Sequence, residues 1–146
     1  MQGWGIAREP MDAKEAELKN PLTLAFIGDT VWDLLVRRKL LETSARVNAL
    51  HRQATAMVNA GAQARALERL RPLLSPAEQA VVRRGTNAHC GHATPRNQDP
   101  VDYRRATGLE ALLGWLYLCG RQERITELFC EAFAPETPDG GAEAAP

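Results

Sequence analysis

The segment from Leu22 to Leu41, LTLAFIGDTVWDLLVRRKLL, constrains the fold most strongly, because it places acidic residues in an otherwise apolar helical pattern. Its apolar positions recur at a spacing of three and four residues, which is typical of a helix facing a core: Leu24, Ile27, Val31, Leu34 and Leu35. Asn20 and Pro21 form a start signal, since Asn can cap free amides and Pro fits the first helical turn. The segment therefore predicts a helix packed on the core of the domain.

Gly28 and Asp29 are the unusual residues of this helix. A glycine inside a helix costs about 1 kcal/mol relative to Ala, and this cost is most readily tolerated where something must come close to the backbone. Asp29 follows Gly28 directly, and Asp33 lies one turn further on. Carboxylates beside an apolar face indicate either a site for a hard cation or a polar contact between helices. Asp33 has a plainer interpretation, an ion pair with Arg37 four residues later.

The rest of the chain predicts an all-α fold, because no strand alternation of any length and no internal repeat occurs. Helical patterns cover five further segments: Met11–Lys19, Ala45–Arg71, Pro76 to about Arg84, Pro100 to about Gly120, and Gln122–Phe133. Thr43 or Ser44 is the expected cap of the long second segment, and Gly61 is expected to bend or divide it. Ser75 to Glu78 reads as a capping box with Pro at the first helical position.

Length and composition are those of one ordinary globular domain, with 146 residues, 45% hydrophobic and 25% charged. No apolar run reaches the ~18 residues of a membrane span, and the N-terminus lacks a signal-peptide core. We therefore expect a cytoplasmic protein with one domain over residues 1–134 and a disordered, Pro- and Gly-rich tail over 135–146. The three cysteines, without a zinc-ligand repeat, agree with a reducing compartment.

Charge is strongly segregated along the chain, although the formal net charge is zero. Residues 37–105 contain 13 Lys and Arg against 5 Asp and Glu, a net charge of +8, and the remainder carries −8. All three histidines also lie in the basic segment. Such a surface suits a polyanion such as nucleic acid, although charged runs are often only solvated helix faces.

Glu110 is the second anomalous acid, because it lies among leucines in the last long helical segment. A lone buried carboxylate is costly, so it needs a donor or a cation nearby. Small residues accompany it at helical spacing, forming a row on which another helix can pack closely: Thr107, Gly108, Ala111 and Gly114.

A polar stretch from Gly85 to Gln98, GTNAHCGHATPRNQ, is expected to be a long loop. Loops of this length in a compact domain are usually functional. The cluster of His89, Cys90 and His92 suggests a metal, but no partner motif completes a tetrahedral zinc set. Asn and Arg side chains beside glycines suit contacts to phosphates and sugar hydroxyls better.

These segments together resemble the Mini-ribonuclease III family, the compact branch of the ribonuclease III endonucleases. LAFIGD at 24–29 is similar to that family's signature around its first metal-binding Asp, and ATGLEALLG at 106–114 is similar to the segment around its catalytic Glu. Between them, matching residues run from Leu50 to Gln63 and from Arg83 to Ala88. Four segments in order, across most of residues 20–130, make the resemblance specific.

The resemblance implies a helical ribonuclease III-type domain that dimerises and cuts double-stranded RNA, with Mg²⁺ held by the catalytic residues Asp29 and Glu110. Hydrolysis would proceed by in-line attack of a metal-activated water on a phosphodiester. Its expected substrate is the precursor of large-subunit (23S) ribosomal RNA, with a ribosomal protein as a possible further partner. The candidate RNA-binding residues are Arg83, Arg84, Asn87, His89, Arg96, Asn97 and Arg105.

The chain departs from the longer ribonuclease III enzymes in two respects. Leu22, Ala25 and Thr107 stand where those enzymes have further acids, as in the Mini branch, which leaves open whether one or two metal ions bind. The chain also ends about where their catalytic domain ends, without the αβββα RNA-binding domain. RNA affinity is then expected to come from the basic segment and the loop of the catalytic domain itself.

Two other classes of function are compatible with parts of the sequence. A non-catalytic RNA-binding or scaffold protein on the same fold would keep the basic surface but would not need both Asp29 and Glu110. A helical regulator could bind DNA through the Arg-rich helices, but no compact helix-turn-helix pattern is evident.

Overall fold

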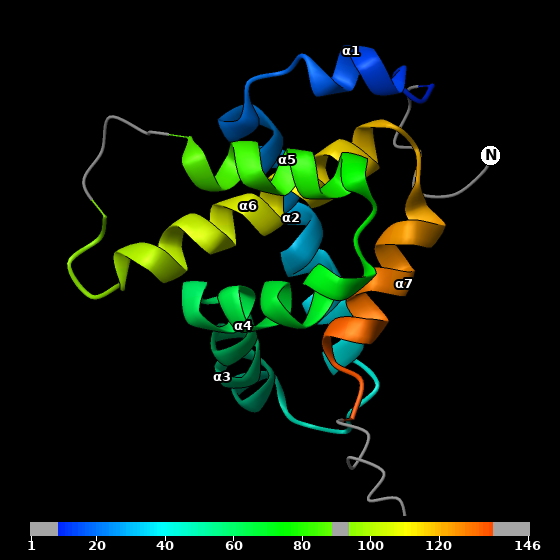
Figure 1. Ribbon diagram of the computed structural model, residues 1–146. Coiled ribbons are helices and arrows are strands. Elements are labelled where there is room, and N and C mark those ends of the chain that lie inside the picture. Colours follow the sequence, from blue (N-terminus) through cyan, green and yellow to red (C-terminus); the bar gives the residue numbers. More distant parts are fainter. Residues whose placement is uncertain (1–8, 89–93, 136–146) are drawn as a thin grey trace, which may run out of the picture.

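The computed structural model describes residues 9–88 and 94–135, and within these ranges the chain is helical without any strand (Figure 1). The all-α prediction is therefore confirmed. The α-helices are α1 (Ala13–Glu17), α2 (Pro21–Leu40), α3 (Val47–Val58), α4 (Ala60–Leu70), α5 (Pro76–Asn87), α6 (Pro100–Leu118) and α7 (Gln122–Ala132), and a short 3-10 turn, η1 (Arg71–Leu73), follows α4. In this described part of the chain, no helix is both long and apolar enough to span a membrane.

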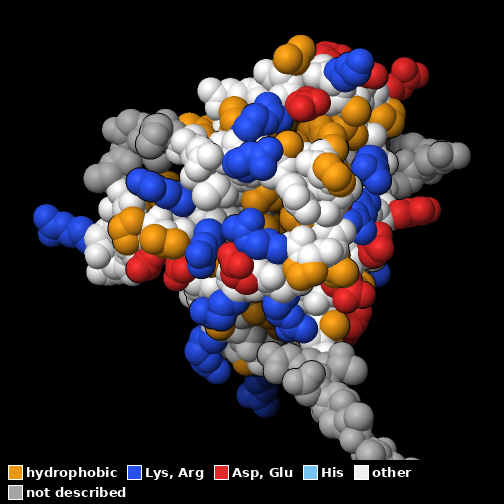
Figure 2. Space-filling view, in the orientation of Figure 1, with side chains coloured by type: hydrophobic (Ala, Val, Ile, Leu, Met, Phe, Trp, Pro, Cys, Tyr) orange, Lys and Arg blue, Asp and Glu red, His pale blue; other side chains and the backbone are white. Residues whose placement is uncertain are grey.

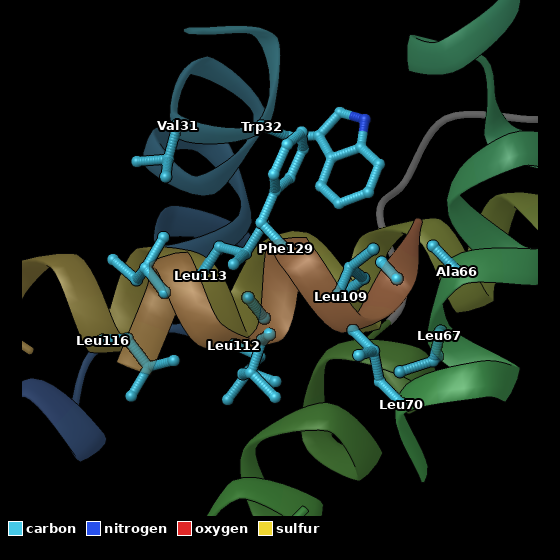
Figure 3. Close-up of a cluster of buried hydrophobic side chains, with 14 of the residues drawn as sticks. Val31, Trp32, Ala66, Leu67, Leu70, Leu109, Leu112, Leu113, Leu116 and Phe129 are labelled. Carbon is cyan, nitrogen blue, oxygen red and sulfur yellow. The ribbon is translucent and has the colours of Figure 1, made fainter. Parts of the chain in front are cut away.

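Helix α6 forms the centre of the domain, with α2 crossing it and α5 and α4 on opposite sides in the view of Figure 1. Its leucines fill the core, where they meet side chains of α2, α4 and α7 (Figure 3). Trp32 of α2 packs edge-on against Phe129 of α7, with ring centroids 5.4 Å apart. Trp32 is only 1% exposed, and its indole N–H donates to the Met57 carbonyl at 3.0 Å. The core thus forms around the long apolar helix near the C-terminal end of the fold.

The predicted helix starts at Asn20 and Ser75 are confirmed. Asn20 Oδ1 accepts a hydrogen bond from the Leu22 amide at 2.9 Å. Ser75 and Glu78 form the complete capping box, and Glu78 also binds Arg124 of α7 at 2.8 Å. These caps satisfy amides that a helix leaves free at its start, so they fix where α2 and α5 begin.

The expected division of the 45–71 segment at Gly61 was wrong, since the break lies at Asn59. Asn59 adopts extended backbone angles, donates through Nδ2 to the carbonyls of Thr55 and Ala56, and accepts from the Ala62 amide at 2.8 Å. It therefore ends α3 and caps α4 at once. Thr43 does not cap α3 either: its hydroxyl donates to the Leu40 carbonyl and closes the end of α2.

Two further expectations are corrected. Leu34 was assigned to the core-facing stripe of α2, but its side chain is 49% exposed. The polar loop was expected to begin at Gly85, yet α5 continues to Asn87. Gly85 stays helical because it packs against α6, where an added Cβ would lie 2.8 Å from the Cβ of Ala111. The middle of the loop and the predicted disordered tail beyond residue 135 lie outside the described residues.

The crossing of α2 and α6 brings their backbones into direct contact. A Cβ added to Gly28 would overlap the Glu110 carbonyl oxygen and lie 2.9 Å from the Gly114 amide. A Cβ added to Gly114 would overlap the Leu24 carbonyl oxygen and lie 2.8 Å from Ile27 Cγ2. The predicted close approach of another helix to the small residues of α6 is thus confirmed, and it leaves no room for a side chain at either glycine.

We predict that Gly28→Ala destabilises the protein by about 3 kcal/mol or more, because the new methyl group must push two helix backbones apart. Ala is the better helix former by about 1 kcal/mol, so any net loss reports the clash. Gly61→Ala is the matched control: the nearest obstacle there is the flexible Arg65 side chain at 3.3 Å, and we expect a change between zero and a gain of about 1 kcal/mol. Urea unfolding of both variants measures the difference. Equal stability of the two would contradict the close-packing argument.

Candidate active site

Asp29 and Glu110 are brought side by side by the contact between α2 and α6. Gly28 packs against the backbone of Glu110, so the next residue, Asp29, lies beside it. Asp29 is on the exposed side of α2, whereas the Glu110 side chain is largely enclosed between helices. The two acids that sequence reasoning singled out, 81 residues apart in the chain, therefore form one site.

The two carboxyl groups share an environment that opposes their ionisation. Burial, followed by the negative charge of Asp29, raises the pKa of Glu110 to about 8. Burial also raises the pKa of Asp29, with a smaller contribution from Asp33. The site is thus short of positive charge, which a bound cation would supply.

Asp33 has the role predicted from its spacing. Its carboxylate accepts a hydrogen bond from the Arg37 guanidinium, with an Nε to Oδ2 distance of 3.1 Å, and both side chains are largely solvent-exposed. Asp33 therefore contributes to the negative field at Asp29 but is itself paired.

Gln63 is a residue near this site whose role the sequence did not reveal. It lies on α4, is 2% exposed, and its amide is near enough to the Glu110 carboxyl to lower that group's pKa. Its Nε2 nevertheless makes no hydrogen bond of normal geometry among the described residues. A usable signal was present: Gln63 occupies the apolar stripe that contains Ala60, Leu67 and Leu70. A polar residue at such a position calls for a polar neighbour, and Glu110 is the one that the fold provides.

Three of the candidate RNA-binding residues, Arg83, Arg84 and Asn87, line one open pocket of about 600 Å³. The other side of this pocket comes from the junction of α1 and α2, with Lys19 and Asn20. Arg84 is partly committed to the fold, because its Nη1 donates to the Glu17 carbonyl at 2.7 Å. The pocket nevertheless gathers three cationic side chains at one place.

The remaining candidate RNA-binding residues are dispersed. Arg96 and Asn97 are exposed in the turn before α6. Arg105 pairs with Glu68 of α4 at 3.5 Å, and His89 lies outside the described residues. In the face of Figure 2, Lys and Arg side chains are numerous over α3, α4 and α5, while Asp and Glu side chains lie toward α7, beside α1 and in part among the basic ones. The charge segregation seen in the sequence is thus only partly visible on this face.

The donor set suits a hard cation better than zinc. Among the described residues, no group of three or more His, Cys, Asp and Glu side chains could together hold a metal ion. Asp29 and Glu110 offer two carboxylates, and Mg²⁺ typically needs only one or two when water and phosphate supply the other ligands. The His89–His92 cluster lies outside the described residues.

The family is decided by comparison with known proteins. The family model of the ribonuclease III domain matches residues 22–121, which include α2, α6 and both acids. The chain belongs to the ribonuclease III family. It is an endoribonuclease of this class, whose substrates are double-stranded RNA.

Several relatives of this ribonuclease III chain are named Mini-ribonuclease 3. The protein from Symbiobacterium thermophilum is 51% identical over 109 residues, covering 74% of this chain and 83% of the relative. The one from Brevibacillus brevis is 45% identical over 135 residues, covering 92% and 96%. A crystal structure of a Fusobacterium nucleatum protein superposes with a TM-score of 0.71 at 28% identity, covering 78% of this chain and 91% of that one.

The raised pKa of Glu110 predicts an unusual pH dependence of stability for the metal-free enzyme. In the folded state Glu110 keeps its proton up to about pH 8, whereas in the unfolded chain it loses it near the ordinary value of 4.5. The folded state therefore binds more protons between these values, and the free energy of unfolding falls as pH rises through this window, with a slope of at most about 1.4 kcal/mol per pH unit. Urea unfolding in EDTA at several pH values checks this, and Glu110→Gln should flatten the slope. An unchanged slope in that variant would show that Glu110 is not the group responsible.

Proposed function

We propose that this ribonuclease III enzyme is a Mg²⁺-dependent homodimer that matures the 23S ribosomal RNA precursor. The observation that carries the proposal is the pair of Asp29 and Glu110, held together by a backbone contact and jointly deficient in positive charge. A scaffold protein would gain nothing from this arrangement, because it costs stability. The names of the relatives support the Mini branch, from which the rRNA substrate is inferred.

The residues of the site divide the catalytic work between them. Asp29, on the open side of α2, is accessible to a phosphodiester, and Glu110 closes the inner side of the site. When bound, Mg²⁺ would supply an activated water and neutralise charge on the phosphate during in-line hydrolysis. Both carboxyl groups are then needed in their ionised form. The positive charge of the bound cation would favour that form.

RNA binding is assigned to the pocket between α5 and the α1–α2 junction. Arg83, Arg84 and Lys19 are cations that can neutralise backbone phosphates, and Asn20 and Asn87 offer amides for phosphate or ribose oxygens. Such contacts carry no base sequence, which suits an A-form duplex read mainly by shape. Arg96 and Asn97, exposed in the turn before α6, are proposed as separate contacts to the RNA.

The dimer proposal is supported by the exposed face of α2. Phe26 is 81% exposed and Leu34 is 49% exposed. Phe26 lies three residues before Asp29, so it is a neighbour of the acid on the helix surface, whereas Leu34 lies further around the helix. The large apolar residues Trp32, Leu112 and Trp115 are buried in the core and offer nothing to such a contact. A symmetric dimer through Phe26 would place two copies of the site around a two-fold axis, as cutting both strands of a duplex requires.

Two variants, each with a matched control, separate cleavage from binding. Asp29→Asn keeps the shape of the side chain but removes the charge, so we expect cleavage of long double-stranded RNA to fall by more than about a hundredfold with nearly unchanged RNA affinity. Asp33→Asn should have a much smaller effect, because Asp33 is paired with Arg37. Cleavage by Asp29→Asn at the wild-type rate in saturating Mg²⁺ would reject the assignment.

Arg83→Gln should weaken RNA binding and reduce the slope of log K against log salt by about 1. Arg121→Gln, outside the pocket, is the control and should change neither.

Phe26→Glu tests the dimer. A charge at the centre of an apolar contact should convert the protein to monomers, measured by light scattering after size-exclusion chromatography. Because the Phe26 side chain is exposed in the single chain, helicity and cooperative unfolding should persist. Val47→Glu, also at a highly exposed apolar position, is the control and should leave the mass unchanged. A dimeric Phe26→Glu protein would remove α2 from the interface.

A further inference from the structure

Gln63 is buried deep in the domain, in a place where a polar side chain is unexpected. It lies on the inner face of α4 with only 2% of its surface exposed, in line with Ala60, Ala64 and Leu67. This face of α4 packs against α6. An apolar residue of the same size would serve the core better, so the amide calls for another explanation.

The amide of Gln63 is directed at Glu110. It is close enough to act on that carboxyl as a hydrogen-bond donor, but its Nε2 is fully buried and has no hydrogen bond of normal geometry among the described residues. A buried donor without a complete bond is destabilising. This destabilisation is explained if Nε2 donates a hydrogen bond to Glu110 when that carboxyl group is ionised.

We propose that Gln63 is a positioning residue that donates to one carboxylate oxygen of Glu110 and leaves the other oxygen directed toward the cation beside Asp29. This inference rests on the proposed function, because it assumes a divalent cation at Asp29 and Glu110. Outer groups that orient metal ligands in this way commonly affect metal affinity by ten- to a hundredfold.

The chemistry of the amide suits this task better than a charged group would. A Lys or Arg at position 63 would neutralise Glu110 and compete with the cation for it. A second acid would add repulsion to a site that already lacks positive charge. The carboxamide is neutral and carries two N–H donors. It can therefore fix the orientation of the Glu110 carboxylate, and the negative charge of that carboxylate remains available to the metal.

Gln63→Met provides the test, because Met keeps the length of the side chain and removes both donors. Mn²⁺ binding to the RNA-free protein is measured by isothermal titration calorimetry, alongside thermal unfolding without metal. We expect Mn²⁺ affinity to fall by about tenfold or more and the melting temperature to stay equal or rise. In cleavage assays the Mg²⁺ concentration for half-maximal rate should rise by a similar factor, and the rate should recover at saturating Mg²⁺.

Two controls separate failure of the inference from failure of the proposed function. Gln53→Met makes the same change at an exposed position of α3 and should bind Mn²⁺ as the wild type does. Glu110→Gln should lose Mn²⁺ binding. If it does and Gln63→Met binds normally, the positioning role is refuted and the proposed function stands. If Glu110→Gln binds Mn²⁺ normally, both are overturned.

A purely structural role of Gln63 predicts a different pattern. The melting temperature of Gln63→Met would then fall while Mn²⁺ affinity stayed unchanged, and this result would overturn the inference. Gln63→Leu, which also lacks donors, is the second variant in case Met does not fit the core. Agreement of the two variants in weaker Mn²⁺ binding, without loss of stability, would support positioning.

Discussion

The backbone contact between α2 and α6 at Gly28 and Gly114 is the constraint on which the rest of the structure depends. Each glycine sits where the other helix leaves no space for a Cβ, so the two helices approach as closely as their main chains allow. That separation fixes the position of Asp29 relative to Glu110 more firmly than side-chain packing could, because a backbone cannot change rotamer. The proposed catalytic pair is thus built where two helix backbones touch.

Glycines also allow close backbone packing between α5 and α6. Gly85 and Gly108 face each other there, and a Cβ on Gly108 would overlap the hydroxyl of Thr86 and lie 2.9 Å from the Val82 carbonyl oxygen. This second close contact anchors the end of α5 that carries Arg83 and Asn87. Helix α2, with Asp29, and helix α5, with the proposed RNA-binding residues, are thus both packed directly on the backbone of α6. Their relative positions therefore follow from two sets of glycine contacts on one helix.

Much of the fold could be predicted from sequence because its signals are local. Asn20 and Ser75 are capping residues wherever they precede a helix, and the apolar spacing of α2 and α6 needs no tertiary information. One error arose because a residue's role depends on a neighbour distant in sequence, and another arose because a local cap was overlooked. Gly85 was taken for a loop residue, but it is a packing residue, and Gly61 was taken for a break that Asn59 makes by capping. Gln63 gave a local warning, a polar residue in an apolar stripe, yet only the fold shows that Glu110 is opposite.

Helix α2 joins the separate features of the enzyme because its two sides have different tasks. Its inner side is held against α6 by Gly28 and carries the core residues Val31 and Trp32. Its outer side exposes Asp29, with the exposed Phe26 three residues before it. A second copy seated on Phe26 would therefore lie within about one helical turn of the acid, so that dimer formation would exclude water beside Asp29 and strengthen its interaction with a cation. In the proposed enzyme, the exposed Phe26 and the carboxylates of Asp29 and Glu110 are neighbours, so the proposed dimer contact adjoins the proposed cation site and each would strengthen the other.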